Sequence, residues 1–285
     1  MSTKPIESKH KSGVILVLIS ALVFSSAGVF TKGVTADAWA VIFWRGLAAA
    51  IFTLGFLIMK GQLKKEIALF GGPALAVTLM MALGTVAFIP AFKLTSVANV
   101  ALIWASAPFT TAALAWLFIG ERPTRIILIA SCVAFGGVCI IFAGSVGGGN
   151  LTGDFLALWM TLMMSCAMVI YRRWPETTAA LPAAFSSLVL LLVALLSGAP
   201  LSVPTNELPI LMLFGLVFAV ASVTLSEGAR RLPPAETALL STFETPLAPA
   251  LAFLLLQEVP AKSTVLGGIV IFLVVIWSQR GKLMI

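Results

Sequence analysis

One carboxylate lies deep inside an apolar stretch of the chain. Glu244 is the tenth residue of the segment 235–257. The face that it shares at helical spacing carries small polar residues, namely Thr237, Ser241 and Thr245. A charge in hydrocarbon costs about 2.5–3.5 kcal/mol on insertion scales, so such residues face a bundle interior and mark a pathway. Glu244 is therefore a candidate proton or cation site, or a partner for a substrate ammonium. The competing interpretation is a structural hydrogen bond to a neighbouring helix.

Trp104 is the second candidate. An offset of 137 residues, which recurs along the chain, places it at the position of Ser241. An indole on a pathway can form the wall of a cavity or attract a substrate amine through a cation–π interaction. Packing toward lipid is the equally weighted alternative.

Two serines and a methionine are further candidates for the pathway. An offset of 140 residues pairs Ser25 with Ser165, each on a helix face of small or polar residues. These serines could line the path, although close helix packing through small residues is slightly favoured. Met164 belongs to a methionine-rich stretch that could form an adaptable apolar wall or only fill gaps in a core.

The apolar segments contain prolines, among them Pro90, Pro108, Pro246 and Pro249. Pro108 and Pro246 match each other within one residue under the offset of 137. Proline removes a backbone hydrogen bond and kinks a helix, so we predict hinges there, by analogy with the broken helices of transporters. The alternative is that both prolines only shape the packing.

Arg45 is a basic residue within a predicted span. It lies seven residues after the start of the segment 38–59. Its side chain can extend along the helix to the outer surface, which we favour, or pair with a carboxylate, including that of a substrate.

The elements that carry these residues are ten apolar stretches. Of 285 residues, 60% are hydrophobic and 10% are charged, whereas about a quarter of a soluble domain is charged. Each stretch approaches the roughly 20 residues that span a bilayer as a helix, and the stretches are too continuous for barrel strands. We predict an all-α integral membrane protein with ten transmembrane helices: 13–34, 38–59, 67–92, 96–119, 123–145, 154–171, 180–198, 208–229, 235–257 and 262–280.

Basic residues gather on alternate ends of these segments. Of the 18 Lys and Arg residues, all but four fall on the side of the N-terminus, the exceptions being Lys32, Lys93, Lys262 and the intramembrane Arg45. This bias predicts that both termini are cytoplasmic. The net charge of +7 therefore reflects orientation in the cell inner membrane, and we predict no nucleic-acid partner.

The apolar segments lack the residues of an active site or a metal site. Cys132, Cys139 and Cys166 have no metal-ligand spacing, and the single histidine, His10, lies in the predicted tail. No Gly-x-Ser-x-Gly or His-Glu-x-x-His motif occurs. We predict no catalytic residue, no metal and no cofactor, and that the protein is not an enzyme.

The two halves of the chain repeat each other. Residues 98–123 begin Ala-Asn-Val-Ala-Leu and end Gly-Glu-Arg-Pro, and residues 235–260 begin Ala-Glu-Thr-Ala-Leu and end Gln-Glu-Val-Pro. Each half has an odd number of predicted helices, so the second half enters the membrane inverted, which is a transporter pattern. The predicted units are a cytoplasmic tail and two five-helix repeats: 1–12, 13–145 and 154–280.

These residues resemble the EamA domain of the drug/metabolite transporter superfamily. The resemblance rests in the first half on the stretch from Ala98 to Gly144 with Pro108 and Gly120-Glu121-Arg122, and in the second on Ala235 to Leu240, Glu244, Pro246 and Glu258. The chain is also similar to the YddG-type amino-acid exporters. The resemblance implies a ten-helix exporter of amino acids or related small metabolites that works by alternating access.

Together these features predict a secondary transporter. Its predicted partners are the lipid bilayer and a small molecule, either an amino acid or an organic cation, and the proton is a candidate coupling ion. A polyspecific drug or cation efflux carrier, a nucleotide-sugar carrier and an uncoupled facilitator remain alternatives, because a fold does not fix a substrate.

Overall fold

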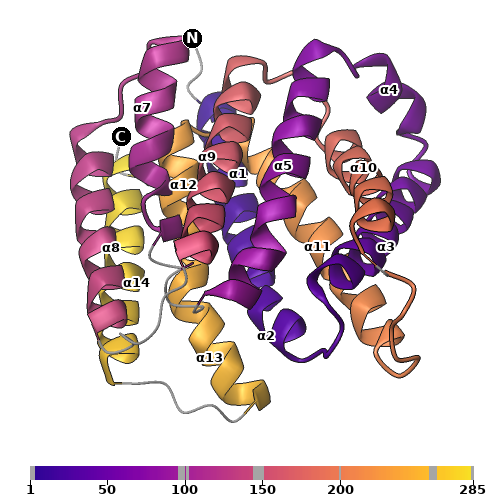
Figure 1. Ribbon diagram of the computed structural model, residues 1–285. Coiled ribbons are helices and arrows are strands. Elements are labelled where there is room, and N and C mark those ends of the chain that lie inside the picture. The colour runs from indigo at the N-terminus through magenta and orange to yellow at the C-terminus, as the bar shows by residue number, and fades with distance from the viewer. Residues whose placement is uncertain are drawn as a thin grey trace.

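The structure is a computed structural model that describes residues 4–95, 100, 103–143, 151–198, 200–256 and 262–283, and its regular elements are α-helices (Figure 1). The helices of the first half are α1 (Lys4–Phe24), α2 (Ala27–Lys32), α3 (Ala38–Met59), α4 (Leu63–Ala68), α5 (Gly72–Leu94), α7 (Ala107–Ile119) and α8 (Arg125–Ala143). Those of the second half are α9 (Leu151–Arg173), α10 (Ala180–Ser197), α11 (Leu208–Ala229), α12 (Pro234–Ser241), α13 (Glu244–Leu256) and α14 (Lys262–Leu283).

Six helical segments are long and apolar enough to cross a membrane: Lys9–Thr31, Ala38–Met59, Gly72–Leu94, Leu151–Arg173, Ala180–Ser197 and Leu208–Ala229. They coincide with six of the predicted spans. Shorter apolar helices lie within three others: Ala107–Ile119, Arg125–Gly137 and Val265–Ser278. Large apolar side chains also point outward, such as Leu117 and Leu196, which are 75% and 89% exposed. Because so much apolar surface needs lipid around it, the chain is a multi-pass membrane protein.

Three segments that the sequence predicts as continuous helices are interrupted. Turns separate α1 from α2 at 25–26, α12 from α13 at 242–243, and helical residues 103–104 from α7 at 105–106. In each turn an N–H bonds to the carbonyl three residues earlier, with the pairs Ser26 to Val23, Ser106 to Ile103 and Phe243 to Leu240. Such tight turns inside a helix often mark hinges.

The two proline-containing breaks are equivalent in the two halves. The turns at 105–106 and 242–243 differ by the same offset of 137 residues. Pro108 lies at the second position of α7 and Pro246 at the third position of α13. Proline in the first turn of a helix costs no internal hydrogen bond. Both prolines therefore follow a break and begin a new helix, whereas the sequence led us to expect kinks within continuous helices.

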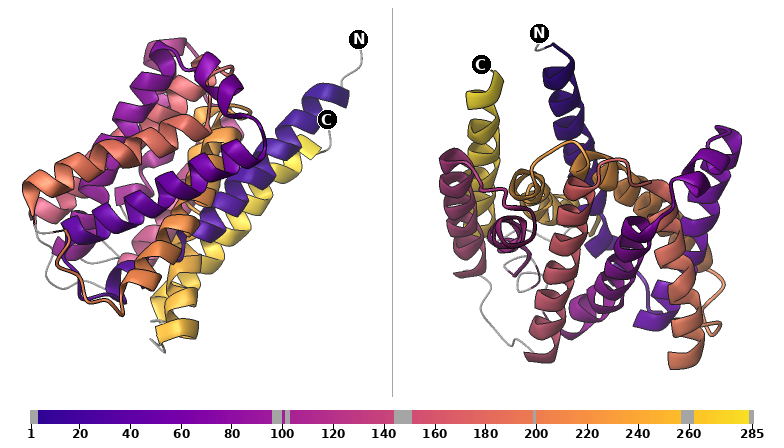
Figure 2. Two further views of the ribbon diagram at one scale, coloured as in Figure 1. Left: turned by 90° about the vertical axis from the view of Figure 1, so that its right-hand side faces the viewer. Right: turned by 90° about the horizontal axis from the view of Figure 1, so that it is seen from above.

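Contacts between helices follow the two-fold pattern that two equivalent repeats produce. The helix pairs α1–α11 and α5–α9 match, as do α3–α11 and α5–α10, while α3–α10, α7–α12 and α8–α14 join equivalent helices of the two halves. The pair α8–α14 stands at one edge of the bundle in Figure 1 and in the right-hand view of Figure 2.

The first helix begins earlier than the sequence suggests. Residues from Lys4 onward, expected as a tail, belong to α1. His10 contacts the start of α12, where its Nε2 lies 3.1 Å from Oε1 of the buried Glu236. The beginning of α1 and the end of α14 lie at the same end of the molecule (Figure 2).

Candidate functional site

The two equivalent breaks lie against each other inside the bundle. Ala105, in the turn before α7, belongs to the same buried cluster as Leu240 of α12 and Val17 of α1, and Phe243 packs against that cluster. The helix α12 also contacts α7, α9 and α1, and α13 contacts α1 and α2. The elements that carry the predicted site residues therefore converge.

Trp104 lies in the largest apolar cluster of the described residues, and only 7% of its surface is exposed. Its cluster includes Met81 of α5, Met160 and Met168 of α9, and Ala238 of α12. This position is incompatible with the alternative in which the indole faces lipid. The methionines make the surroundings apolar and adaptable.

Three predicted site residues have buried polar atoms that lack a hydrogen-bond partner among the described residues: Trp104 Nε1, Ser165 Oγ and Thr245 Oγ1. Leaving a buried polar group unpaired costs about 1–3 kcal/mol. Such atoms are expected where water or a ligand completes the hydrogen bonds.

Glu244 is the first residue of α13 and is half-buried beside the break. No hydrogen bond or ion pair joins its carboxylate to another described residue. A negative charge at a helix N-terminus is stabilised by the helix dipole. The carboxylate therefore lies beside the break, at the N-terminal end of the α13 dipole.

The remaining predicted residues make local contacts. Ser25 Oγ donates to the carbonyl of Leu22 at 2.5 Å, and Ser241 Oγ donates to that of Thr237 at 2.9 Å. Met164 packs on Gly84 of α5 so closely that a methyl group on this glycine would lie 2.5 Å from its Cε. The two serines therefore bond within their own chain segment, and Met164 packs between α9 and α5.

Two further residues have unpaired buried polar atoms: Ser222 Oγ and the Nε and Nη1 of Arg45. Arg45 is only 1% exposed, so the prediction that it reaches the outer surface is wrong. Sequence analysis missed Ser222, whose only signal is its helical spacing from Phe218 and Phe214 on α11.

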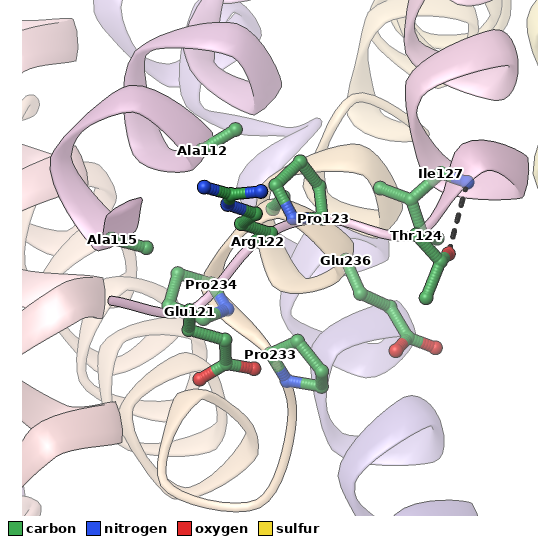
Figure 3. A pocket seen from close by; sticks show the side chains of 11 residues that line it. Ala112, Ala115, Glu121, Arg122, Pro123, Thr124, Ile127, Pro233, Pro234 and Glu236 are labelled. Carbon is green, nitrogen blue, oxygen red and sulfur yellow. Dashed lines mark hydrogen bonds between the residues drawn. The ribbon is translucent and has the colours of Figure 1, made fainter. Parts of the chain in front are cut away.

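A separate cleft lies near His10, between the α7–α8 and α11–α12 connections (Figure 3). Its wall includes Glu121, which accepts two hydrogen bonds from Arg172 at 2.9 and 3.2 Å. Glu236 lines the same cleft, and Thr124 caps α8 by accepting from Ile127 N at 3.3 Å. No predicted site residue lines this cleft, so it is distinct from the converging breaks.

One carboxylate fastens the loop that follows α2. Glu207 accepts hydrogen bonds from Thr35 N at 2.9 Å, from Thr35 Oγ1 at 2.6 Å and from Ala36 N at 3.1 Å. The hydrogen bonds from Thr35 and Ala36 lower the pKa of the Glu207 carboxyl, and Lys93 adds a favourable charge. Lys93 also donates to the carbonyl of Ala36 at 2.7 Å. We call Glu207, Thr35 and Ala36 the Glu207 latch.

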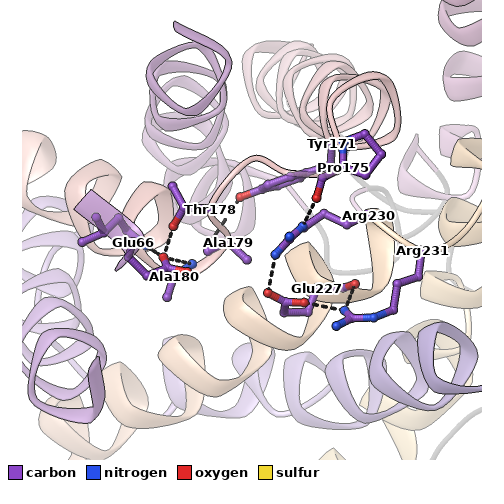
Figure 4. A network of polar contacts seen from close by, with 10 residues as sticks. Glu66, Tyr171, Pro175, Thr178, Ala179, Ala180, Glu227, Arg230 and Arg231 are labelled. Carbon is purple, nitrogen blue, oxygen red and sulfur yellow. Dashed lines mark hydrogen bonds and ion pairs between the residues drawn. The ribbon is translucent and has the colours of Figure 1, made fainter. Parts of the chain in front are cut away.

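A second carboxylate does the same at the other end of the bundle. Glu66 of α4 accepts from Thr178 Oγ1, and from Ala180 N and Leu181 N at 3.3 and 3.2 Å (Figure 4). These N–H groups begin α10. We call Glu66, Thr178, Ala180 and Leu181 the Glu66 latch. Figure 1 shows α4 and the α2–α3 loop at opposite ends of the molecule.

The two latches are equivalent parts of the two halves. In each, a glutamate before one helix accepts from a threonine hydroxyl in the loop after another helix and from two backbone N–H groups, which lie in that loop for Glu207 and at the start of α10 for Glu66. The signal was present in the sequence as two Thr-Ala pairs, Thr35-Ala36 and Thr178-Ala179, with a glutamate about 30 residues further on in each half. Sequence analysis did not use it.

A model of the EamA-like transporter family matches residues 11–143 and, a second time, residues 151–279. The chain belongs to the EamA-like transporter family. It is therefore a membrane transporter of the drug/metabolite type. A crystal structure of another protein superposes on this transporter with a TM-score of 0.80 at 14% identity, covering 95% of this chain and 98% of that chain. This likeness shows that the two proteins share a fold. No curated protein matches the transporter closely.

Proposed function

We propose that this transporter exports amino acids or related small metabolites across the cell inner membrane by alternating access. The moving parts are two inverted five-helix repeats, residues 13–145 and 154–280, with ten spans and cytoplasmic termini. The turns at 105–106 and 242–243 act as hinges, followed by Pro108 and Pro246.

The observation that carries this proposal is the meeting of the two equivalent breaks next to unpaired polar atoms. Trp104 Nε1 and Thr245 Oγ1 are buried without a partner among the described residues, and Glu244 begins the helix after the second break. Transporters bind substrates at broken helices where the two repeats meet. An amine group fits the Glu244 carboxylate, and the face of the Trp104 indole adds a cation–π surface.

Counterflow in proteoliposomes tests the proposal. Purified protein is reconstituted, and uptake of a labelled amino-acid panel is measured with and without unlabelled competitor inside. Saturable uptake that internal substrate accelerates is expected. Uptake that does not saturate indicates a facilitator, and no uptake above empty liposomes, in protein shown to be folded, removes amino acids as substrates.

The role of Glu244 is tested with Glu244→Gln. We expect flux at saturating substrate to change between pH 5 and 8 while the folded protein is retained. Glu176→Gln is the matched control, because Glu176 is exposed in the turn after α9. A Glu244→Gln flux profile that overlays the wild type would remove Glu244 from the mechanism.

Efflux of organic cations is the second candidate function. The methionine cluster around Trp104 favours it, because methionine surfaces adapt to varied apolar ligands, and the Glu244 carboxylate suits a cationic group. Counterflow with quaternary ammonium dyes, in protein that fails to transport amino acids, would select this alternative.

A further inference from the structure

The transporter holds a cation within the membrane. Arg45 of α3 is the largest of the fully buried side chains. Its Cζ lies 3.9 Å from the ring centroid of Phe218 and 5.3 Å from that of Phe214, both on α11. These rings offset part of the cost of burying the charge. No described carboxylate pairs with Arg45, and its Nε and Nη1 find no hydrogen-bond partner in the part of the chain that the structure describes.

The packing of α3 on α11 shows the direction of this side chain. Ile42 shares a cluster with Phe214, and Ala49 shares one with Phe218, so the two helices run parallel. Measured along the axis of α3, Phe218 therefore lies farther from the first residue of that helix than Arg45 does. Because the guanidinium is nearer to Phe218 than to Phe214, it points away from the start of α3 and into the bundle.

The same two rings border the break in the first helix. Phe24, the last residue of α1, packs edge-on against Phe218 with 5.7 Å between ring centroids. Phe30 of α2 stacks on Phe214 at 5.0 Å. A bend at 25–26 therefore displaces Phe24 and Phe30 relative to each other, and these rings pack on the two rings that lie against the guanidinium.

Two more features place polar groups around this break. The hydroxyl of Ser222, one helical turn beyond Phe218, is buried and has no partner among the described residues. The helix α13, which begins with Glu244, packs on α2. The first helix, α1 and α2, thus contacts both α11, whose rings cover Arg45, and α13, which begins with Glu244. A cation and a carboxylate, each without an ion-pair partner among the described residues, near one interrupted helix suit a zwitterion.

We propose that Arg45 binds the carboxylate of the transported molecule when the first helix bends at 25–26, with Ser222 as a second donor. This inference rests on the proposed function and adds the substrate class, a small metabolite that carries a carboxylate. The planar guanidinium suits this class, because its N–H groups match a carboxylate in geometry and charge.

Paired substrates test the proposal. Fluxes of L-leucine and isoamylamine, and of L-phenylalanine and 2-phenylethylamine, are compared in proteoliposomes with wild-type protein, Arg45→Met and the control Arg173→Met. Arg173 is exposed and its Cζ lies 5.6 Å from the Trp174 ring. We expect Arg45→Met to lower the ratio of amino-acid to amine flux by about tenfold or more, since charge-assisted hydrogen bonds are the strong class. An unchanged ratio in folded Arg45→Met overturns the proposal and leaves the proposed function standing.

A binding measurement distinguishes failure of the Arg45 proposal from failure of the proposed transport function. Melting of detergent-purified protein is followed in acetate and in chloride at equal ionic strength. Acetate is expected to raise the Tm of the wild type and of Arg173→Met, and to leave that of Arg45→Met unchanged. Equal stabilisation by chloride overturns the carboxylate assignment. If no substrate is transported but acetate acts through Arg45, the proposed function fails and the anion site remains.

The ligand-free protein gives a further test. Replacing an unpaired buried charge with an apolar side chain of similar length is often neutral or stabilising, so Arg45→Met is expected to melt at or above the wild-type temperature. If it melts lower, the flux ratio is measured with Arg45→Gln, which keeps donors without the charge. An unchanged ratio in Arg45→Gln then overturns the proposal.

Discussion

The Glu207 latch and the Glu66 latch use the same chemical groups, but they join parts of different stiffness. The loop held by Glu207 follows α2, a six-residue helix beyond the break at 25–26. The loop held by Glu66 follows α9, which runs unbroken from Leu151 to Arg173. Hydrogen bonds of the same kind therefore restrain an interrupted helix at one end and a continuous helix at the other.

Beside its latch the Glu207 end has the hydrogen bond from Lys93 to the carbonyl of Ala36, whereas the Glu66 end has contacts from both Arg230 and Tyr171. Arg230 Nε donates to the carbonyl of Pro175 at 2.5 Å, and its Nη1 lies 2.7 Å from Glu227 (Figure 4). Tyr171 OH reaches the carbonyl of Ala179 at 3.5 Å. We infer that the Glu207 end, the outer end in the predicted orientation, opens with less rearrangement than the Glu66 end.

Locking the Glu207 latch is expected to give the largest effect. Thr35→Cys and Glu207→Cys are joined by a short, reducible thiol cross-linker, in protein whose native cysteines, Cys132, Cys139 and Cys166, are replaced by alanine. Flux should fall about tenfold or more because the end cannot open, and reductant should restore it. The same protein without cross-linker is the control, and full transport by cross-linked protein would show that this end does not open there.

Removing each carboxylate compares the two latches directly. Glu66→Ala leaves the buried Thr178 hydroxyl and two N–H groups of α10 without their acceptor, so unfolding should become easier by about 1–3 kcal/mol. Glu207→Ala should lower the Tm less, because Thr35 is exposed to solvent. The decrease in Tm of each variant is measured in the same detergent. A larger decrease for Glu207→Ala than for Glu66→Ala would contradict the inference that the Glu207 end opens with less rearrangement.

The Glu207 latch should respond to acid. Its carboxyl pKa is lowered from the ordinary 4.5, so its contribution is complete above about pH 4.5 and is lost as the pH falls through the lowered value. The difference in Tm between the wild type and Glu207→Ala should therefore stay constant from pH 8 to 5 and shrink as the pH falls below about 4.5. A difference that already shrinks between pH 8 and 5 would assign the pH response to another group.

Removing the additional contact at the Glu66 end should have the smallest effect. Arg230→Met breaks a partly exposed ion pair with Glu227, and such pairs contribute about 0–1 kcal/mol. Little change in Tm is expected, with faster labelling of a cysteine introduced at Glu176 in the same turn. Arg173→Met is the control, and unchanged labelling would mean that Arg230 does not restrain this end.

Much of the fold was accessible from sequence because hydrocarbon imposes length and composition on a spanning helix. The family and the apolar segments agree with the sequence prediction, and the burial of Trp104 excludes only its lipid-facing alternative. The break at 25–26 was not predictable, because Ser25-Ser26 is compatible with a continuous helix and the matching α9 is continuous through Ser165. Contacts between the two halves decide whether such a helix is broken, as at 25–26, or continuous, as in α9.

The candidate site was predicted in part. Helical periodicity places Glu244 and Thr245 on one face, but it does not show which polar atoms find partners. Ser241 bonds to its own helix, whereas Ser165 has no partner among the described residues. Whether a hydroxyl is satisfied depends on rotamers and neighbours that a spacing pattern does not contain.

The sequence by itself determined the class of protein, its family and the helical segments, since these follow from local composition and repeat spacing. Only the tertiary structure decided the direction of Arg45, because the rings of Phe214 and Phe218 come from a helix some 170 residues further on. It likewise decided the latches, because Glu66 and Glu207 reach their partners over 112 and 172 residues. Contacts over such separations exist only once both repeats have packed together.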